Sequence, residues 1–320
     1  MTERQGGLTL VFPGQGAQFV GMATGLLEGS ARARELFAAA DDLLAMPLTR
    51  IIQEGPAELL DDTAVTQPAI LTVSVALWRE IEARCEEAPS VACVAGHSLG
   101  ELSALTVAGA WSFEEGLRLV QRRGEAMAAA GQAAPGGMGV ILGLSDDEVR
   151  GLLDEVGGSE PGVWVANLNC PGQVVISGLE QPVQTALELA QARGAKRAMP
   201  LAVSVAAHTP LMQAANEALA EALDRIAVQA PWAPVVCNAW ARPISDPQEI
   251  KQALLAQLTH PVQWTASVER MAGMGVQAAL EIGPKAVLGA LIRRIAPDMA
   301  RLAVTDLAEA RDLALEEFTR

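Results

Sequence analysis

Short apolar runs alternate with longer segments of helical spacing along most of the chain. The runs predicted to be buried strands are Leu8–Phe12, Val91–Ala95, Val235–Ala239 and Ala278–Glu281. Apolar residues recur at helical spacing in Pro68–Arg84, Ser112–Ala130, Pro210–Ala227, Pro247–Gln257 and Ala286–Ile295. Pro68 and Pro247 suit the first helical position, and Ser112 with Glu115 forms a capping box. Strands that alternate with helices in this way predict a mostly parallel sheet covered by helices.

The pattern changes after the linker-like stretch Ala133–Gly137. Strands are predicted at 139–144, 163–167, 173–177 and 196–203, with helices at 146–156 and 181–193 and a turn at Asn169–Gly172. This βαββαβ order is typical of the ferredoxin-like arrangement. We therefore expect a small inserted ferredoxin-like domain at 132–204. The remainder, 1–131 and 205–320, is predicted to form a large doubly wound α/β domain.

Composition and charge narrow the class of protein. Half of the 320 residues are hydrophobic, which fits a compact α/β enzyme. The formal net charge of −15 provides no global positive field, so we expect no nucleic-acid partner. No apolar run is long enough to span a bilayer and Met1–Gln5 is no signal peptide, which predicts a cytoplasmic protein with no membrane partner. The scattered cysteines predict reduced core thiols rather than a metal site or a disulfide framework; they are Cys85, Cys93, Cys170 and Cys237.

Ser98 lies between two glycines in the segment Gly96–Gly100, directly after a predicted strand and before a predicted helix. This G-x-S-x-G pattern is typical of a nucleophile elbow, in which a strained turn exposes the serine hydroxyl, as in the α/β-hydrolase fold. The helix N-terminus behind the serine would favour developing negative charge. The alternative interpretation is a plain glycine-rich turn.

A serine nucleophile needs a general base, and the chain has three histidines. His97 neighbours the nucleophile and is expected to point elsewhere. His260 precedes a proline, which suggests a surface turn. By elimination His208 is the predicted base, and the alternative is a histidine satisfied in the core or at the surface.

Arg123 lies four residues from both Leu119 and Met127, so it is predicted to lie on an apolar helical stripe. Arg118 and Arg122 repeat on a neighbouring, wetter face. A buried guanidinium requires an anionic partner. Spacing alone favours an Asp or Glu of the core.

Together these residues resemble the malonyl-CoA:acyl carrier protein transacylases and the acyltransferase domains of polyketide synthases. The resemblance covers nearly the whole chain and rests on Phe12–Gln18, Thr66–Ala69, Gly96–Glu101, Gln121–Gly124, Asn167–Gln173, His208–Met212 and Gln257–Trp264. It implies a large doubly wound, α/β-hydrolase-like domain that carries an inserted ferredoxin-like domain.

The resemblance also implies site roles. Ser98 would be the acylated nucleophile and His208 its general base. The backbone N–H groups of Gln15 and Leu99 would form the oxyanion hole, although Gln15 alone would be interpreted as a turn residue.

Two further roles come only from the resemblance. Arg123 would hold the free carboxylate of a malonyl group. The expected anionic partner of Arg123 is then the substrate rather than the core Asp or Glu that spacing alone favours. The backbone carbonyl of Gln257 would orient the histidine in place of an acidic side chain.

The implied reaction transfers a malonyl group from malonyl-CoA, through a malonyl-serine, to the phosphopantetheine thiol of an acyl carrier protein, for fatty-acid or polyketide synthesis. No cofactor is expected besides malonyl-CoA as the acyl donor, and the protein is expected to be a monomer. Because the chain is acidic, docking of an acidic carrier must be local. Lys196–Arg197 and Arg293–Arg294 are either docking charges or solvated surface pairs.

Three alternatives remain. An acyl hydrolase that edits carrier proteins belongs to the same family, but such hydrolases typically lack the arginine. A serine esterase would place an acid between nucleophile and histidine, where Asp154 and Glu155 fall on the small domain. A scaffold that only docks carriers would have an inert Ser98. Ala207, which lacks the bulk that malonyl-selective relatives often have, and the altered loop Gly283–Leu288 leave the acyl chain and that loop's role undecided.

Overall fold

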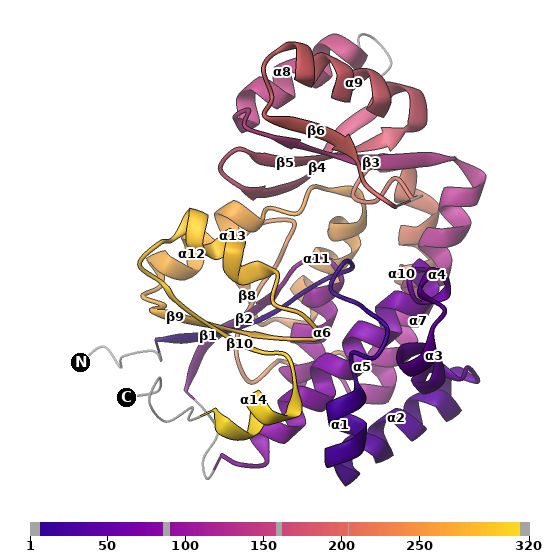
Figure 1. Cartoon of the computed structure of the whole chain (residues 1–320), viewed down its shortest axis with the longest axis vertical. Coiled ribbons are helices and arrows are strands. Elements are labelled where there is room, and N and C mark those ends of the chain that lie inside the picture. The colour runs from indigo at the N-terminus through magenta and orange to yellow at the C-terminus, as the bar shows by residue number, and fades with distance from the viewer. Residues whose placement is uncertain (1–6, 86–89, 158–161, 204, 314–320) are drawn as a thin grey trace.

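The computed structural model describes residues 7–85, 90–157, 162–203 and 205–313. The stretch Met1–Gln5, expected not to be a signal peptide, lies outside these residues. The described residues form a six-stranded sheet and a four-stranded sheet. In Figure 1 the smaller sheet lies above the larger one.

The larger sheet is almost entirely parallel. Its strands follow the order β10-β9-β1-β2-β7-β8, and only the edge pair β7–β8 is antiparallel. The strands are β1 (Leu8–Phe12), β2 (Val91–Gly96), β7 (Val235–Val236), β8 (Pro243–Ile244), β9 (Ala278–Ile282) and β10 (Ala300–Val304). This confirms the predicted parallel-rich, helix-covered sheet. The strand predicted at Val235–Ala239 is shorter because Asn238 turns away to contact the site described below.

Helices cover both faces of the larger sheet. Leu10 and Phe12 of β1 pack into the core beneath α5, α6 and α7, whereas Val11 packs into the core beneath α12 and α13. Burial on both faces explains why the strands are continuous apolar runs. The helices around this sheet are α1 (Thr24–Gly29), α2 (Ala31–Leu44), α3 (Leu48–Glu54), α4 (Ala57–Leu60), α5 (Thr63–Glu82), α6 (Leu99–Val107), α7 (Phe113–Ala133), α10 (Gln213–Leu223), α11 (Pro247–Thr259), α12 (Trp264–Gly273), α13 (Leu288–Ile295) and α14 (Leu307–Asp312).

Two helix predictions were wrong in detail. Pro68 does not begin α5 but lies inside it, because Asp62 caps the helix by accepting a hydrogen bond from the backbone N–H of Ala64. Nearly the whole helix is buried, and this packing offsets the backbone hydrogen bond that a proline cannot donate. The helix predicted at Pro210–Ala227 is divided into a 3₁₀ turn, η1 (Pro210–Met212), and α10. The capping box of Ser112 and Glu115 at the start of α7 is confirmed.

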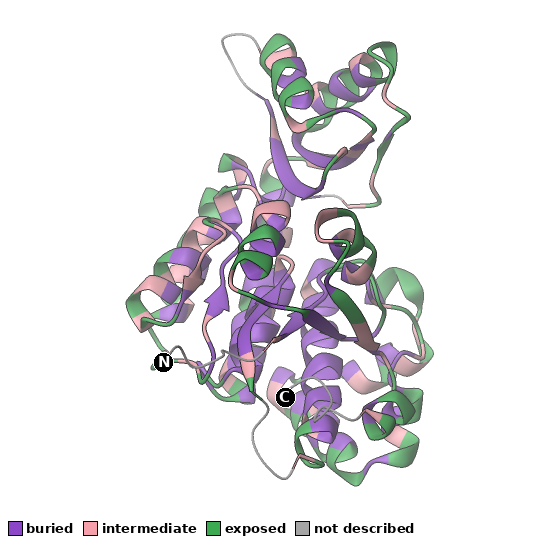
Figure 2. Cartoon of the chain, turned by 90° about the vertical axis from the view of Figure 1, so that its left-hand side faces the viewer, coloured by how far each residue is buried: buried purple, intermediate pink, exposed green. Residues whose placement is uncertain are grey.

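The smaller sheet is antiparallel and has the order β4-β5-β3-β6. Its chain order is β3 (Gly136–Leu142), α8 (Asp146–Gly157), β4 (Val163–Cys170), β5 (Gln173–Leu179), α9 (Glu180–Ala192) and β6 (Arg197–Pro200). Helices α8 and α9 cover one face, where Val174 and Ile176 pack with them. Val175, which alternates with these residues, packs into the core of the larger unit. Figure 2 shows the buried side of these helices turned toward the sheet.

Three limits of the smaller sheet differ from the prediction. Gly136 and Gly137 belong to β3 rather than to a linker, because β3 pairs along its full length with β5. A Cβ atom at Gly136 would lie 2.4 Å from the carbonyl oxygen of Gly178, so only glycine permits this pairing. Strand β6 ends at Pro200, short of the predicted 203, and Cys170 extends β4 so that the turn is confined to Pro171–Gly172.

The two units are joined by backbone contacts. The N–H of Val262 donates to the carbonyl of Ala166, and the N–H of Leu168 donates back to the carbonyl of Val262. The strands that begin and end the smaller unit are neighbours, since Leu201 donates to the carbonyl of Met138. The smaller sheet is therefore fixed to the segment that follows α11.

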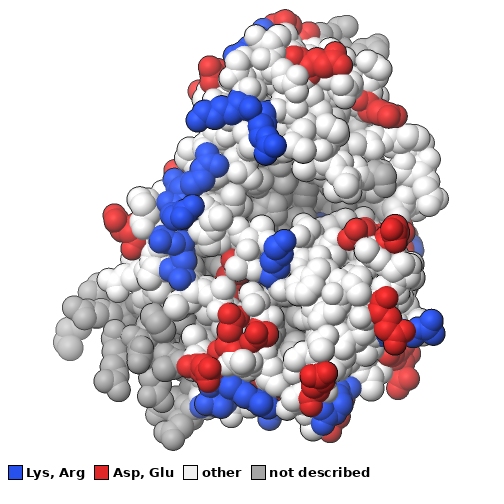
Figure 3. All heavy atoms as spheres, viewed as in Figure 1, with Lys and Arg blue, Asp and Glu red and all other residues white. Residues whose placement is uncertain are grey.

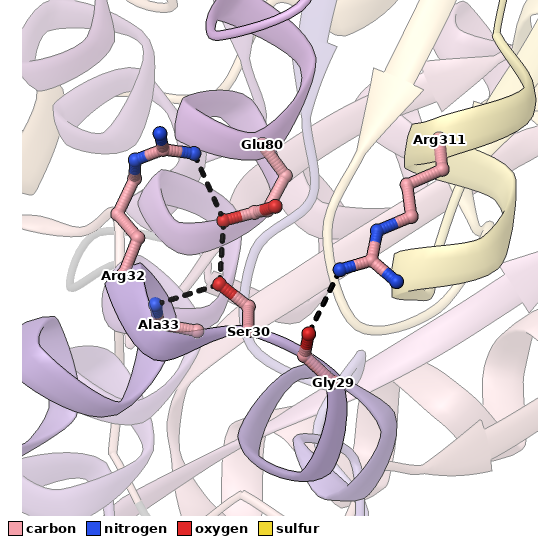
Figure 4. Close-up of polar contacts among 6 residues, drawn as sticks. All are labelled: Gly29, Ser30, Arg32, Ala33, Glu80 and Arg311. Carbon is pink, nitrogen blue, oxygen red and sulfur yellow. Dashed lines mark hydrogen bonds and ion pairs between the residues drawn. The ribbon is translucent and has the colours of Figure 1, made fainter.

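A polar cluster ties the first helices to α5 (Figure 4). The buried carboxylate of Glu80 accepts hydrogen bonds from Ser30, the N-cap of α2, and from Arg32. Arg311 of α14 donates to the carbonyl of Gly29, which places the last described helix against the first. No helix within the described ranges is both long and apolar enough to cross a membrane.

Candidate active site

Ser98 lies on a sharp turn between β2 and α6. Its backbone angles, φ 53° and ψ −108°, lie outside the usual regions for a residue with a side chain. A Cβ atom at Gly96 would lie 2.0 Å from the carbonyl carbon of Gly100, and one at Gly100 would lie 2.0 Å from the carbonyl oxygen of Phe12. Both glycines are therefore required for the strand, the turn and the helix to approach. A strand, a tight turn and a helix meet at Ser98, so the geometry is that of the nucleophile elbow rather than of a plain glycine-rich turn.

His208 contacts the serine hydroxyl from the other side of the site. Its Nε2 atom lies 2.9 Å from Oγ of Ser98, and its Nδ1 atom lies 2.8 Å from the carbonyl oxygen of Gln257. A carbonyl only accepts, so Nδ1 carries the proton and Nε2 is free to accept one from the serine. Burial, together with the positive charge of Arg123, lowers the pKa of His208 to about 3. The imidazole is therefore neutral at pH 7, as a general base must be.

Arg123 is buried beside the same hydroxyl. Its Nη2 atom lies 3.2 Å from Oγ of Ser98 and donates to the side-chain carbonyl of Gln257 at 3.0 Å. Nη1 donates to the side-chain carbonyl of Gln67 at 2.7 Å. The apolar stripe is observed, because Leu119 and Met127 are buried with it.

The hydrogen-bond acceptors of Arg123 are neutral, two side-chain amides and the Ser98 hydroxyl, whereas its spacing on the helix predicted a core carboxylate. In the described part of the chain no ion pair joins this guanidinium to an Asp or Glu, and its Nε atom has no hydrogen-bond partner. Burial lowers its pKa only to about 10, so the group stays cationic at neutral pH. The site therefore contains a buried positive charge with no direct anionic partner, aimed at the serine.

Gln15 and Leu99 lie on the two segments that meet at the elbow. Leu99 is the first residue of α6, and Gln15 follows β1. These segments touch, because a Cβ atom at Gly14 would lie 2.4 Å from the carbonyl oxygen of His97. Neither the Gln15 nor the Leu99 backbone N–H forms a hydrogen bond within the described residues. Both remain available to an oxyanion, as the resemblance implies.

Three site residues were missed by the sequence reasoning: Gln67, which accepts from Arg123, and the two residues Asn238 and Glu101. Asn238 accepts a hydrogen bond from the backbone N–H of Ser98 at 2.7 Å and donates to the carbonyl of Gly96 at 2.7 Å. Glu101 is fully buried and accepts from the backbone N–H of Asn238 and from the side chain of Gln257. The available signal was the position of Asn238 two residues after the end of β7, the parallel neighbour of the elbow strand.

The other two histidines lie outside this network. Nε2 of His97 lies 2.8 Å from the side-chain oxygen of Asn169, and its ring packs against Trp264. His260 is exposed, and its Nδ1 atom lies 2.9 Å from the carbonyl oxygen of Ala256. Both positions agree with the elimination that singled out His208.

A cavity of about 760 Å³ leads to His208. It is lined by His208 and His260 from the larger unit and by Arg150 and Trp164 from the smaller one. A second cavity of about 470 Å³ reaches Gln15 from the side of Thr63. The cavities give the dyad and the predicted oxyanion site two approaches from solvent. Among the described residues, no group of three or more His, Cys, Asp or Glu side chains is placed to hold a metal ion.

The elbow serine, the neutral buried histidine and the buried arginine define a class: enzymes that carry an acyl group on a serine. Comparison with known proteins narrows this class. The family model described as the acyl transferase domain matches residues 9–311. The chain belongs to this acyl transferase family.

Its relatives cover nearly the whole chain. The malonyl CoA-acyl carrier protein transacylase of Salmonella typhimurium is 43% identical over 298 residues, which are 93% of this chain and 96% of that protein. The structure of the malonyl CoA-acyl carrier protein transacylase of Coxiella burnetii has a TM-score of 0.92 at 38% identity and covers 98% of both chains. A malonyl-transacylase solved in complex with a type II PKS acyl-carrier protein has a TM-score of 0.92 at 41% identity, covering 97% of this chain and 99% of the other.

Proposed function

We propose that this protein transfers a malonyl group from malonyl-CoA to the phosphopantetheine thiol of an acyl carrier protein. The observation that carries the proposal is the position of Arg123, whose Nη2 atom donates to the nucleophile's hydroxyl at 3.2 Å and whose other hydrogen-bond acceptors are neutral amides. A buried guanidinium in this state suits an acyl group that ends in a carboxylate. The activities named for the relatives agree with this substrate.

In the first half-reaction Oγ of Ser98 attacks the thioester carbonyl of malonyl-CoA while Nε2 of His208 accepts the hydroxyl proton. The N–H groups of Gln15 and Leu99 stabilise the oxyanion of the tetrahedral intermediate, and the N-terminus of α6 adds its partial positive charge. The carbon–sulfur bond then breaks, and the CoA sulfur takes the proton from His208. The products are a malonyl-serine ester and free CoA.

In the second half-reaction the phosphopantetheine thiol gives its proton to Nε2 of His208 and attacks the ester carbonyl. The same two N–H groups stabilise the second tetrahedral intermediate. The carbon–oxygen bond breaks, and Oγ of Ser98 recovers the proton from His208. The carbonyl of Gln257 holds Nδ1 throughout, so the ring keeps one orientation in both halves.

Arg123 sets the choice of acyl group. Bidentate contact with the malonyl carboxylate pairs its charge, whereas an acetyl group leaves the charge unpaired at a cost of about 2–5 kcal/mol. The same arginine disfavours the alternative of an acyl hydrolase that edits carrier proteins. No cofactor enters this chemistry, because malonyl-CoA supplies the acyl group as substrate.

The carrier protein would dock on a basic patch formed by Lys196, Arg197, Arg293 and Arg294, all of them exposed. The turn at Pro171–Gly172 connects the two pairs. Arg294 donates to the carbonyl of Pro171. The carbonyl of Gly172 accepts from the N–H of Gly143, and Lys196 packs against Gly143. Figure 3 shows a column of basic side chains running down one side, from the smaller unit onto the larger. Such a column provides the local positive field that an acidic carrier needs.

We also propose a finer division of the fold. The chain order and strand order of the smaller sheet support a ferredoxin-like domain, with limits at 132–204. Residues 1–131 and 205–320 would then form one doubly wound, α/β-hydrolase-like domain. We further propose that the protein acts as a monomer in the cytoplasm, where the thiols of Cys93, Cys170 and Cys237 remain reduced.

Intact-protein mass spectrometry after brief exposure to malonyl-CoA, methylmalonyl-CoA and acetyl-CoA tests the proposal. We expect a malonyl adduct that is lost in Ser98→Ala and transferred when a carrier protein with its phosphopantetheine arm is added. An equal methylmalonyl adduct would show that Ala207 leaves a wide pocket. An acetyl adduct that is indifferent to Arg123→Ala, and that water removes as fast as the carrier does, would support the hydrolase instead.

A further inference from the structure

Glu101 is a fully buried carboxyl group three residues after the nucleophile. Its Oε2 atom accepts two hydrogen bonds, from the backbone N–H of Asn238 at 3.0 Å and from Nε2 of Gln257 at 2.7 Å. Its Oε1 atom has no hydrogen-bond partner among the described residues. A buried carboxyl with a free oxygen is costly, which calls for a reason beyond packing.

Each donor to Glu101 also holds a part of the site. Asn238 accepts from the backbone N–H of Ser98, and Gln257 accepts from Nη2 of Arg123. Asn238 therefore links Glu101 to the backbone of the nucleophile, and the Gln257 side chain links Glu101 to the guanidinium of Arg123.

The orientation of the Gln257 amide depends on Glu101. Nε2 of Gln257 faces two oxygen atoms, Oε2 of Glu101 and the carbonyl of Ser98, at 2.7 and 3.0 Å. A rotated amide would place its own oxygen against both acceptors. The carboxylate thus keeps Oε1 of Gln257 toward Arg123 and fixes the guanidinium beside the serine.

Glu101 and Arg123 also act on each other electrostatically across this amide. Burial raises the pKa of Glu101 to about 7, and the positive charge of Arg123 partly opposes that rise. In turn, the negative charge of the Glu101 carboxylate raises the pKa of Arg123 and so partly opposes the effect of burial. When Glu101 is ionised, part of the positive field that Arg123 presents to the serine is cancelled.

We propose that Glu101 is a positioning and specificity-tuning residue: its carboxylate competes with the carboxylate of the incoming acyl group for the single buried charge of Arg123. This inference rests on the proposed function, because it assumes an acyl group with a free carboxylate. Loss of the Glu101 charge then strengthens binding of the malonyl group and leaves acetyl unaffected. By linkage, a malonyl group on Ser98 favours protonation of Glu101.

Among the described residues around Glu101, we expect no other group to titrate between pH 6 and 8. Arg123 and Cys237 are the charged or titratable groups coupled to it, and burial holds the pKa of the Cys237 thiol at about 11. Burial also lowers the pKa of the two histidines beside the serine, His97 and His208. A change of acyl selectivity between pH 6 and 8 therefore reflects the protonation state of Glu101.

The test measures the rate constant for acyl-serine formation with malonyl-CoA and with acetyl-CoA from pH 6 to 8. Titration of the CoA phosphates affects both donors and cancels in the ratio. In the unaltered protein we expect the malonyl-to-acetyl ratio to fall by up to about tenfold as pH rises. In Glu101→Gln, which keeps an acceptor for both hydrogen bonds, the ratio should stay high and independent of pH.

Glu281→Gln is the matched control. Glu281 is also buried, and its carboxylate accepts from three backbone N–H groups after β9, away from the serine. Its replacement should leave the pH dependence of the ratio unchanged. A ratio in the unaltered protein that is flat with pH would overturn the inference, as would an equal loss on both donors in Glu101→Gln. Failure of the unaltered protein to form a malonyl-serine at any pH would instead contradict the proposed function.

Discussion

Ser98 and His208 are 110 residues apart in the sequence, yet their reactive atoms lie 2.9 Å apart and both residues have positive φ, 53° and 62°. Such angles are costly for residues with a Cβ atom and persist only where the surroundings impose them. For Ser98 the surroundings are the close approach of Gly96 and Gly100. For His208 they are the hydrogen bond of Nδ1 to the Gln257 carbonyl and complete burial of the ring.

Replacement of Ser98 and replacement of His208 should have different effects on acylation, because one residue is the nucleophile and the other its base. Ser98→Ala should give no acyl adduct from any donor, because the nucleophile is gone. His208→Ala should still form the adduct but about 10²–10⁴-fold more slowly, since only the base is lost. Rapid-quench mass spectrometry measures both, and an undiminished rate in His208→Ala would rule out its role as base.

Arg123→Ala should lower the selectivity for malonyl over acetyl donors by about 2–5 kcal/mol. Arg123→Lys keeps a charge but loses the planar guanidinium, so its selectivity should lie between that of the unaltered protein and that of Arg123→Ala. Arg122→Ala is the matched control, because Arg122 is the preceding residue on α7 and is exposed. Competition between the two donors measures the ratio, and equal losses at both arginines would refute the assignment.

The depressed pKa of His208 predicts how acylation depends on pH. A histidine of ordinary pKa would lose its base function below about pH 6.5. Because the pKa of His208 is lowered to about 3, acylation should continue well below that value. Rates of malonyl-serine formation between pH 7 and pH 5 test this, and a decline centred near pH 6.5 would contradict it.

The same shift affects stability. The unfolded chain binds a proton at this histidine more readily than the folded chain does, so stability decreases as pH falls from about 6.5 toward 3. His208→Ala removes this contribution. Its unfolding free energy should therefore decrease less between pH 6.5 and pH 4 than that of the unaltered protein, as urea denaturation at each pH would show.

A pair of glycine variants tests the packing beneath the elbow. In Gly100→Ala the new Cβ would lie 2.0 Å from the carbonyl oxygen of Phe12, and neither backbone can move aside easily. Gly151 is exposed on α8 with nothing within 4 Å of a new Cβ, so Gly151→Ala should stabilise the protein by up to about 1 kcal/mol. Thermal unfolding should place Gly100→Ala clearly below the unaltered protein and Gly151→Ala slightly above it.

Charge reversal on the basic patch should weaken only the second half-reaction. In Lys196→Glu with Arg293→Glu we expect KM for the carrier protein to rise by about tenfold, with the rate of malonyl-serine formation unchanged. Arg50→Glu, at an exposed ion pair with Glu54, is the control. Because exposed charges are screened, added salt should diminish the difference, and a salt-independent effect would argue against electrostatic docking.

Local signals predicted most of the framework. The apolar run Leu8–Phe12 and the capping box at Ser112 each gave an element with the correct start, because both depend only on neighbouring residues. Pro68 misled because its local preference was outweighed by burial of the whole helix α5. Strands β8 and β10 and the helices α1 to α4, α12 and α14 were not predicted at all. Strand β10, for example, is half exposed and lacks a continuous apolar run.

The site residues likewise fall into those that local patterns predict and those that depend on distant contacts. Ser98 and the apolar stripe around Arg123 could be inferred from spacing, because an elbow and a helix face are local patterns. The neutral partners of Arg123 could not, since Gln67 and Gln257 come from two other helices. Asn238 and Glu101 were missed for the same reason: their roles exist only where β7 lies beside β2.

The pairing of β1 with β9 has a consequence for the order of events during synthesis. Residues 8–12 cannot complete their side of the larger sheet until residues 278–282 have left the ribosome. The strands of the smaller sheet, by contrast, are all encoded between residues 136 and 200. Since contacts close in sequence form first, the smaller unit can fold while the first strand is still waiting for its partner. One edge of Leu8–Phe12 can pair early with β2, but its other edge stays unpaired for most of translation, and an unpaired strand edge favours aggregation.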